Sequence, residues 1–163
     1  MIPQYLLGIM WNFKRFLLLS YLLLIIIKLI CFQSFNTHMK KVVETRNAPS
    51  AIGPYSQAII HNDIVYCSGQ IALNPDSMEV VTGGIEEQTK QVMRNLDAVL
   101  KAAGTGFQNV LKCSIFLDSM DNFPLVNEIY GSFFAENPPA RETVAVKTLP
   151  KNVKIEISCI AHI

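Results

Sequence analysis

The chain has 163 residues, half of them hydrophobic and 17% charged, with a formal net charge of +1. This length favours one domain, because domains usually hold roughly 100–200 residues. The near-zero charge gives no support to a general nucleic-acid binder, the apolar content excludes a disordered chain, and four cysteines are too few for a disulfide scaffold.

The positive mean hydropathy of +0.29 originates in the first 38 residues. Twenty-five of these are hydrophobic, three are cationic (Lys14, Arg15 and Lys28) and none is acidic. Residues 39–163 contain 11 cations and 13 acids, a net of −2, and have the composition of an ordinary soluble domain. We therefore divide the sequence into an apolar leader, residues 1–38, and a domain, residues 39–163.

The leader contains an apolar run over residues 16–32, and Lys14 and Arg15 immediately precede it. A basic start and an apolar run are typical of a signal peptide or a signal anchor. The run is shorter than the ~20 residues that span a bilayer, and no small-residue cleavage site follows. Translation from Met39 is a third interpretation. We expect a cytoplasmic protein in that case, and an organellar, secretory or membrane-anchored one if the leader is used.

The first part of the domain is predicted to be β-rich. Residues 41–44 form a candidate strand, and the prolines of residues 47–54 predict a loop. Residues 58–61 and 64–68 are two further candidate strands. Asn62-Asp63 between them has turn chemistry, which predicts a hairpin.

Residues 85–103 are predicted to form a helix, because apolar residues recur there at helical spacing. Glu86 and Glu87 in its first turn favour the helix dipole, and Gly104 is placed to cap its end. Residues 110–117 alternate polar and apolar side chains and predict a strand.

A second helix follows, with Asp121 as its predicted N-cap and Pro138-Pro139 as its stop. Residues 142–148 and 154–160 are two more alternating strands, joined by a predicted hairpin turn at 149–152. The order β-β-β-α-β-α-β-β indicates an α+β fold with both helices on one sheet face. Oligomerisation is a natural way to cover the other face.

Two charged residues near the end of the chain are candidates for chemistry. Arg141 follows Pro138-Pro139-Ala140, where a guanidinium can hold a carboxylate through two hydrogen bonds. Glu156 is the only acid of the final strand and, on an adjacent antiparallel strand, would reach the same space. This pair suits hydrolysis of a small 2-oxo or 2-imino acid, and an exposed cross-strand ion pair is the alternative. No metal-ligand spacing is present.

An ordered set of short motifs runs through residues 40–163. The motifs are Ala48–Ala58, Ser68–Ile71, Gly83-Gly84, Gln88-Thr89, Asn95-Leu96, Ala102–Gly104, Asn127 with Tyr130 and Phe133-Phe134, Pro139–Arg141, Leu149–Lys151 and Ile155–Ile157. With these motifs the chain resembles the RidA/YjgF family of 2-iminobutanoate/2-iminopropanoate deaminases. Each motif alone is weak, but the ordered set is specific. The leader has no counterpart in the usual family member.

The resemblance implies a chorismate-mutase-like α+β fold with about six strands in a mixed sheet. It also implies a homotrimer with sites in clefts between subunits. The implied reaction hydrolyses reactive 2-enamine and 2-imine acids, such as 2-aminoacrylate and 2-iminobutanoate, to 2-oxo acids and ammonia without a cofactor. The alternatives are a non-catalytic metabolite-binding module, and the endoribonuclease, translation-inhibitor or chaperone roles attached to some relatives. The net charge of −2 on residues 39–163 weighs against RNA.

The resemblance also implies roles for single residues. Arg141 would hold the substrate carboxylate, and Glu156 would position and activate water. Tyr55 and Asn127 would line the pocket. The backbone around Gly69 could bind the carboxylate or the developing tetrahedral species. For the last three, structural alternatives stay open: interface packing, a bond to a neighbouring loop, and a simple bend.

Three positions depart from the family pattern. Thr143 stands where bacterial members often have Cys, and its hydroxyl keeps it a substrate-binding candidate. Glu142 replaces a small residue, and Ser158 replaces an acid. None of these changes removes Arg141 or Glu156, and the presence of both favours an enzyme over a binding module.

Overall fold

The computed structural model describes residues 16–29, 39–134 and 136–163. The chain forms two units, Met1–Met39 and Lys40–Ile163. Residues 16–29 are helical, and apolar side chains along this segment are exposed. No helix in the described ranges is both long and apolar enough to cross a membrane. The predictions for residues 1–15 and 30–38 lie outside the described residues.

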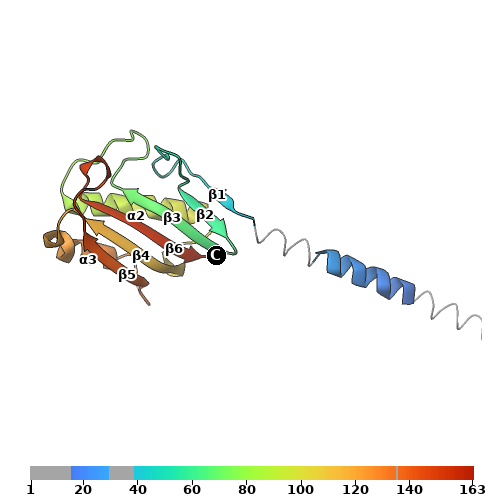
Figure 1. Ribbon diagram of the computed structural model, residues 1–163. Helices are drawn as coiled ribbons and strands as arrows, with labels where there is room; N and C mark the ends of the chain where they lie inside the picture. The colour runs from blue at the N-terminus through green and yellow to red at the C-terminus, as the bar shows by residue number, and fades with distance from the viewer. Residues whose placement is uncertain (1–15, 30–38, 135) are drawn as a thin grey trace, which may run out of the picture. The chain divides into compact units, whose positions relative to one another are not determined.

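The second unit is built on a six-stranded sheet in the order β1-β2-β3-β6-β4-β5 (Figure 1). Its neighbours are antiparallel except β4 and β5, which are parallel, so the sheet is mixed as predicted. The elements are β1 (Lys41–Val43), β2 (Ala58–His61), β3 (Ile64–Ile71), α2 (Ile85–Ala102), β4 (Val110–Leu117), α3 (Phe123–Gly131), β5 (Ala140–Ala145) and β6 (Ile155–His162).

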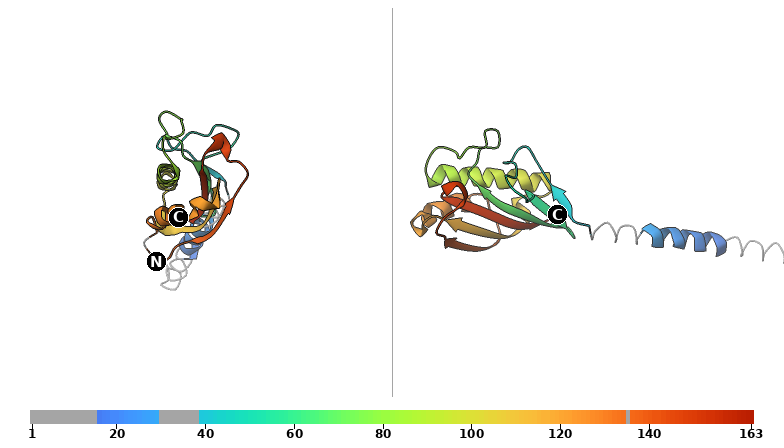
Figure 2. Two further views of the ribbon diagram at one scale, coloured as in Figure 1. Left: turned by 90° about the vertical axis from the view of Figure 1, so that its left-hand side faces the viewer. Right: turned by 45° about the horizontal axis from the view of Figure 1, so that its top comes forward.

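The core lies between the sheet and its two helices. Alternation along β6 puts Ile155, Ile157 and Cys159 into this core, together with Leu96 of α2 and Val126 of α3. Figure 2 shows α2 on one side of the sheet. The opposite face, seen in Figure 1, carries no helix of the second unit. The predicted α+β fold with both helices on one face is thus confirmed.

The backbone conformation confirms two local predictions, the hairpin turn at Asn62-Asp63 and the helix end at Gly104. Asn62 and Asp63 have φ values of 49° and 61°, the left-handed conformation that a tight hairpin turn requires. Gly104, with φ of 85°, ends α2. Strand β3 extends further than predicted, to Ile71, because a register shift between Cys67 and Gln70 lets pairing with β6 continue.

Two predictions in the last part of the chain are wrong. The N-cap of α3 is Asn122 and not Asp121. Ser119, whose hydroxyl accepts a hydrogen bond from the Asp121 N–H, caps the short 3-10 helix (Met120–Asn122) that precedes α3. Residues 149–152 do not form a hairpin. The β4–α3–β5 connection is a crossover, which makes β5 parallel to β4. A 3-10 turn at Pro150–Asn152 then leads the chain back, and β6 inserts between β3 and β4.

Polar side chains of α2 fix the ends of the two central strands. The buried Asn95 Nδ2 donates to the carbonyls of Ile71 and Leu73, both at 3.0 Å. Gln88 Oε1 accepts from the Lys154 N–H at 2.8 Å. These bonds hold the end of β3 and the start of β6 at fixed positions beneath α2.

We predict that Asn95→Ala destabilises the protein by about 2–4 kcal/mol, because it removes the two hydrogen bonds that the buried amide donates to the carbonyls of Ile71 and Leu73. The measurement is the free energy of unfolding from urea titration. Arg94→Ala, a change at the exposed neighbouring position on α2, is the matched control and should stay within about 0.5 kcal/mol of the parent. Equal losses for both variants would contradict the anchoring role.

Candidate active site

The predicted site residues other than Thr143 fall into two groups, each beside its own pocket. One pocket, of about 390 Å³, lies against α3 and β5. The other, of about 300 Å³, lies against β3 and β6. The first is lined by Asn127, Tyr130, Gly131, Phe134, Pro138, Pro139 and Arg141, and the second by Ile52, Tyr55, Ser68, Gly69, Ile71, Pro150 and Glu156.

Arg141 is the cation of the first pocket. Its Nη1 donates to Asn127 Oδ1 at 2.8 Å, and its guanidinium carbon lies 5.1 Å from the Tyr130 ring centroid and 5.4 Å from that of Phe123. Within the described residues, Arg141 forms no ion pair with a carboxylate. These contacts fix the position of the guanidinium and leave some of its N–H groups available to bind an anion.

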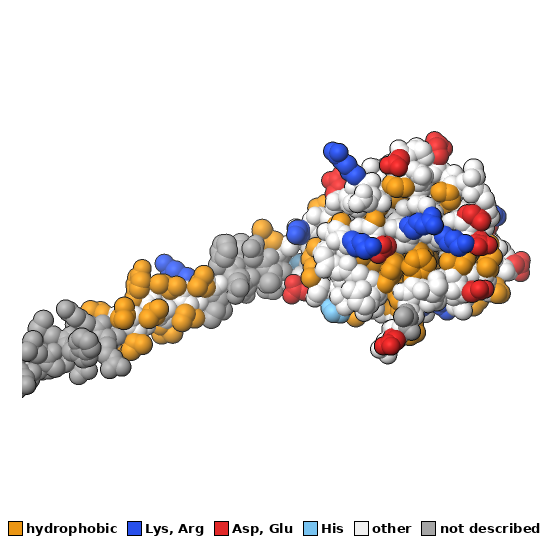
Figure 3. Space-filling model, turned by 180° about the vertical axis from the view of Figure 1, so that it is seen from behind, with side chains coloured by type: hydrophobic (Ala, Val, Ile, Leu, Met, Phe, Trp, Pro, Cys, Tyr) orange, Lys and Arg blue, Asp and Glu red, His pale blue; other side chains and the backbone are white. Residues whose placement is uncertain are grey.

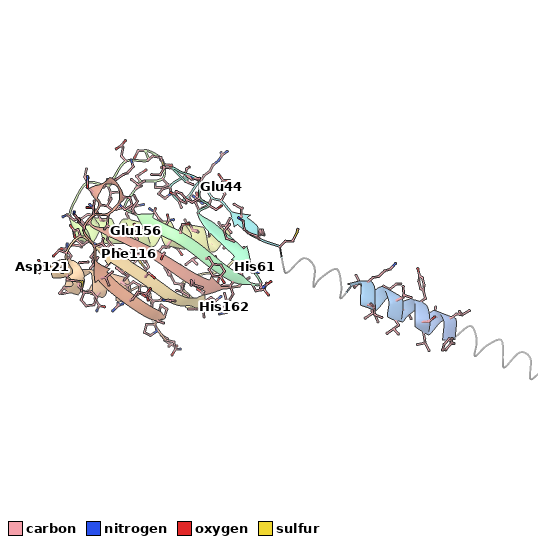
Figure 4. The ribbon with its side chains drawn as sticks, viewed as in Figure 1. Glu44, His61, Phe116, Asp121, Glu156 and His162 are labelled. Carbon is pink, nitrogen blue, oxygen red and sulfur yellow. The ribbon has the colours of Figure 1, made fainter. Side chains whose placement is uncertain are left out.

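Glu156 is the acid of the second pocket. Figure 4 shows it beside Phe116, its register partner on β4. Glu156 is half-buried, and burial raises the pKa of its carboxyl. A raised pKa makes the carboxylate a stronger base than an ordinary glutamate, which favours a role in taking a proton from water.

Gly69 gives Glu156 its position. A Cβ built on Gly69 would overlap the Glu156 carboxylate and stand 2.8 Å from its Cδ. Only glycine therefore lets this side chain lie directly over β3. The register shift between Cys67 and Gln70 puts Gly69 at the irregular part of the strand pairing. Gly69 of β3 and Glu156 of β6 thus lie in direct contact.

Gln57, which sequence reasoning passed over, organises the loop that carries Tyr55. It is 3% exposed, and its amide bonds with the backbone of Thr45, Ala48 and Pro49 at 2.7–3.2 Å. Ser68 Oγ adds a bond of 2.7 Å to the Ser56 carbonyl, which ties the loop to β3. The only signal for Gln57 was its place inside the Ala48–Ala58 motif. Tyr55 itself remains half-exposed at the pocket.

The residues that depart from the family pattern lie outside both pockets. Glu142 accepts hydrogen bonds from Ser114 Oγ at 2.5 Å and Lys112 Nζ at 3.1 Å, and these two contacts lower the pKa of its carboxyl. Glu142 is thus held away from its neighbour Arg141. The Thr143 hydroxyl is buried and has no hydrogen-bond partner among the described residues, and Thr143 is not among the lining residues of either pocket described above.

The expectation that Arg141 and Glu156 share one space within a chain is wrong. Strand β4 lies between their strands. Arg141 is in register with Cys113, a core residue, and so faces the helices, where α3 supplies its contacts. Glu156 lies three positions from Cys159, which also faces the core, so its side chain is on the opposite face.

We predict that Glu156→Gln stabilises the protein at pH 8. The pKa of Glu156 is higher in the folded state than in the unfolded state. The protonated acid therefore contributes its full stabilisation below the unfolded-state pKa, and this contribution is lost as the pH rises through the folded-state pKa. The neutral amide avoids that loss, and a midpoint gain of about 1–3 °C is expected, vanishing near pH 4.

Glu142→Gln is the control of opposite sign. Because the pKa of Glu142 is lowered in the folded state, its ionised carboxylate stabilises the fold above the unfolded-state pKa, and this contribution is lost as the pH falls through the folded-state pKa. Glu142→Gln should therefore destabilise the protein at pH 8. Thermal unfolding followed by circular dichroism at pH 4 and pH 8 measures both variants. A Glu156→Gln midpoint below that of the parent at pH 8 would contradict the burial penalty.

Comparison with known proteins identifies a common family. Residues 45–163 match the family described as Endoribonuclease L-PSP. The human 2-iminobutanoate/2-iminopropanoate deaminase is 45% identical over 123 residues, which are 76% of this chain and 90% of the human one. Reactive Intermediate Deaminase A, chloroplastic, of Arabidopsis thaliana is 47% identical over 78% of this chain and 68% of its own. The crystal structure of E. coli TdcF with bound serine matches at 36% identity with a TM-score of 0.72, covering 76% of this chain and 98% of that one.

Proposed function

The chain belongs to the Endoribonuclease L-PSP (RidA) family, and we propose that it hydrolyses reactive 2-enamine and 2-imine acids to 2-oxo acids and ammonia. The observation that carries the proposal is that one pocket holds Arg141, without an ion-pair partner among the described residues, and the other holds Glu156, whose pKa is raised. The names of the human and Arabidopsis relatives support it.

The proposed reaction gives Arg141 and Glu156 separate roles. Arg141 holds the substrate carboxylate through its free N–H donors. Glu156 takes a proton from water as the water oxygen bonds to the imine carbon. The resulting tetrahedral species receives that proton on nitrogen. Glu156 then takes the proton of the new hydroxyl group and passes it to the same nitrogen as the carbon–nitrogen bond breaks, so that ammonia leaves and the carbonyl of the 2-oxo acid forms. No group of the protein changes covalently, and the balance is one imine and one water.

The proposed site is completed by a second copy of the chain. In one copy Arg141 and Glu156 face opposite sides of the sheet, so a small substrate cannot touch both. The sheet face opposite to the helices exposes Val42, Tyr66 and Val144, each near half of its area. A homotrimer that buries this face and joins the Arg141 pocket of one copy to the Glu156 pocket of the next satisfies both observations.

A nucleic-acid substrate is the less favoured alternative. Residues 39–163 carry a net charge of −2, whereas phosphate binding needs a surplus of cations. On the face shown in Figure 3, Lys and Arg side chains are interspersed with Asp and Glu. A module that binds a metabolite without turnover would not need the half-buried carboxylate of Glu156 beside Gly69.

We propose that the leader directs the protein to its cellular location and takes no part in the reaction. The family match begins at residue 45, after the apolar segment ends. The Arabidopsis relative is named chloroplastic, which supports organellar targeting as one use of such a segment. Anchoring and translation from Met39 remain the competing hypotheses, and the sequence of the mature N-terminus distinguishes them.

We predict that the protein accelerates 2-oxo acid release when a dehydratase generates 2-aminoacrylate or 2-iminobutanoate. Arg141→Lys should raise KM roughly tenfold or more, because an ammonium lacks the two-pronged geometry. Glu156→Gln should lower kcat about 100-fold or more. Arg46→Lys, at an exposed site outside both pockets, is the control. Equal acceleration by Arg141→Ala and the parent would overturn the assignment.

We further predict that two inactive variants complement each other. Arg141→Ala and Glu156→Gln chains, unfolded and reassembled together, should recover up to about a quarter of the parent activity, since random mixing reunites intact halves at that frequency. Each variant reassembled alone is the control. Absence of any recovery in verified mixed assemblies would place the whole site within one chain.

A further inference from the structure

We propose that Phe123 and Tyr130 of α3 are positioning residues for Arg141, which they hold by its π-face contacts so that its N–H donors stay free for a carboxylate. We call this pair the aromatic clamp. Its kinetic readout depends on the proposed function, whereas its binding and spectroscopic readouts do not.

The clamp is a consequence of helical spacing. Phe123, Asn127 and Tyr130 are four and three positions apart, so they form one row along α3. This row contacts the guanidinium of Arg141 on β5, with the two rings at 5.4 and 5.1 Å and the amide oxygen at 2.8 Å. Three side chains of one helix thus fix one side chain of an edge strand.

The chemistry of these contacts leaves the cation available. A guanidinium carries five N–H donors in its plane, and rings attract it without accepting those hydrogen bonds. Asn127 occupies one donor and carries no charge. A carboxylate in its place would take two donors and neutralise the cation, and the carboxylate next to Arg141 in sequence, Glu142, is bound to Ser114 and Lys112 instead.

The clamp is rigid because Tyr130 belongs to the core. Tyr130 is 3% exposed, and its ring lies 4.7 Å from that of Phe134. Burial, and then the neighbouring Cys113 thiol, raise the pKa of Tyr130, so its ring stays uncharged. Arg141 itself is exposed, and an exposed arginine would otherwise sample many rotamers, which a ligand would have to freeze.

The test compares three variants of the full chain. Phe123→Leu removes one ring, Phe123→Tyr restores a ring, and Leu125→Ala changes an apolar residue of the same helix that lies outside the pocket lining. Binding of 2-oxobutanoate is followed by NMR titration, together with the Arg141 Nε–Hε resonance, which ring currents shift. Turnover of 2-iminobutanoate gives KM and kcat separately.

We expect Phe123→Leu to weaken 2-oxobutanoate binding about two- to fivefold, to raise KM by the same factor with kcat nearly unchanged, and to move the Arg141 resonance toward its random-coil position. Phe123→Tyr should recover most of each change, and Leu125→Ala should show none. A lower melting temperature with unchanged binding and an unchanged resonance would reduce Phe123 to a packing residue and overturn the proposal.

A further variant tests whether the residue that bonds to Arg141 from α3 must be uncharged. Asn127→Asp is nearly isosteric, but its carboxylate would pair with Arg141 and should weaken 2-oxobutanoate binding more than tenfold. Retained binding would contradict the proposal. If the parent binds 2-oxobutanoate and Phe123→Leu does not bind it as well, but neither hydrolyses an imine, then the clamp stands and the proposed deaminase function fails.

Discussion

The carboxylate of Glu156 lies over a strand, and that arrangement depends on one missing side chain. Any Cβ at Gly69 would occupy the space of the carboxylate. Within this irregular part of the strand, Ser68 donates a hydrogen bond to the loop that carries Tyr55, and Tyr55, Ser68 and Gly69 all line the pocket. The raised pKa of Glu156 follows from the same close packing, since burial is its only cause. A glycine, a register shift and a half-buried acid thus form one structural unit.

The rest of the domain holds that unit still. Asn95 and Gln88 of α2 bind the chain just after β3 and just before β6, the two strands that carry Gly69 and Glu156. Buried amides of this kind cost stability when unpaired, so their pairing selects one register over its neighbours. Gln57 does the same for the loop. The apolar core supplies most of the stability, whereas these few amides determine where the reactive groups stand.

Local sequence signals predicted the elements well but could not predict strand order. Alternation, helical spacing and turn residues located the helices and strands, the hairpin at Asn62-Asp63 and the cap at Gly104, since each depends on near neighbours. The placement of β6 between β3 and β4 depends on pairing across long separations, which no local pattern encodes. The hairpin predicted at 149–152 failed for that reason, and with it the idea that Arg141 and Glu156 share one space. The motifs named the candidate site residues, but only the fold showed that those beside a pocket form two groups.

The separation of Arg141 and Glu156 has a chemical advantage. Side by side on neighbouring strands they would form an ion pair, which would lower the pKa of the acid and occupy the donors of the cation. Across the sheet, each keeps the property that the proposed hydrolysis requires: Arg141 is held by rings and a neutral amide, and Glu156 keeps its raised pKa. If Arg141 and Glu156 approach each other only between two copies of the chain, the N–H donors of Arg141 stay available to a substrate carboxylate and are not taken by Glu156. Assembly of the proposed homotrimer would then complete the catalytic site as well as bury the open sheet face.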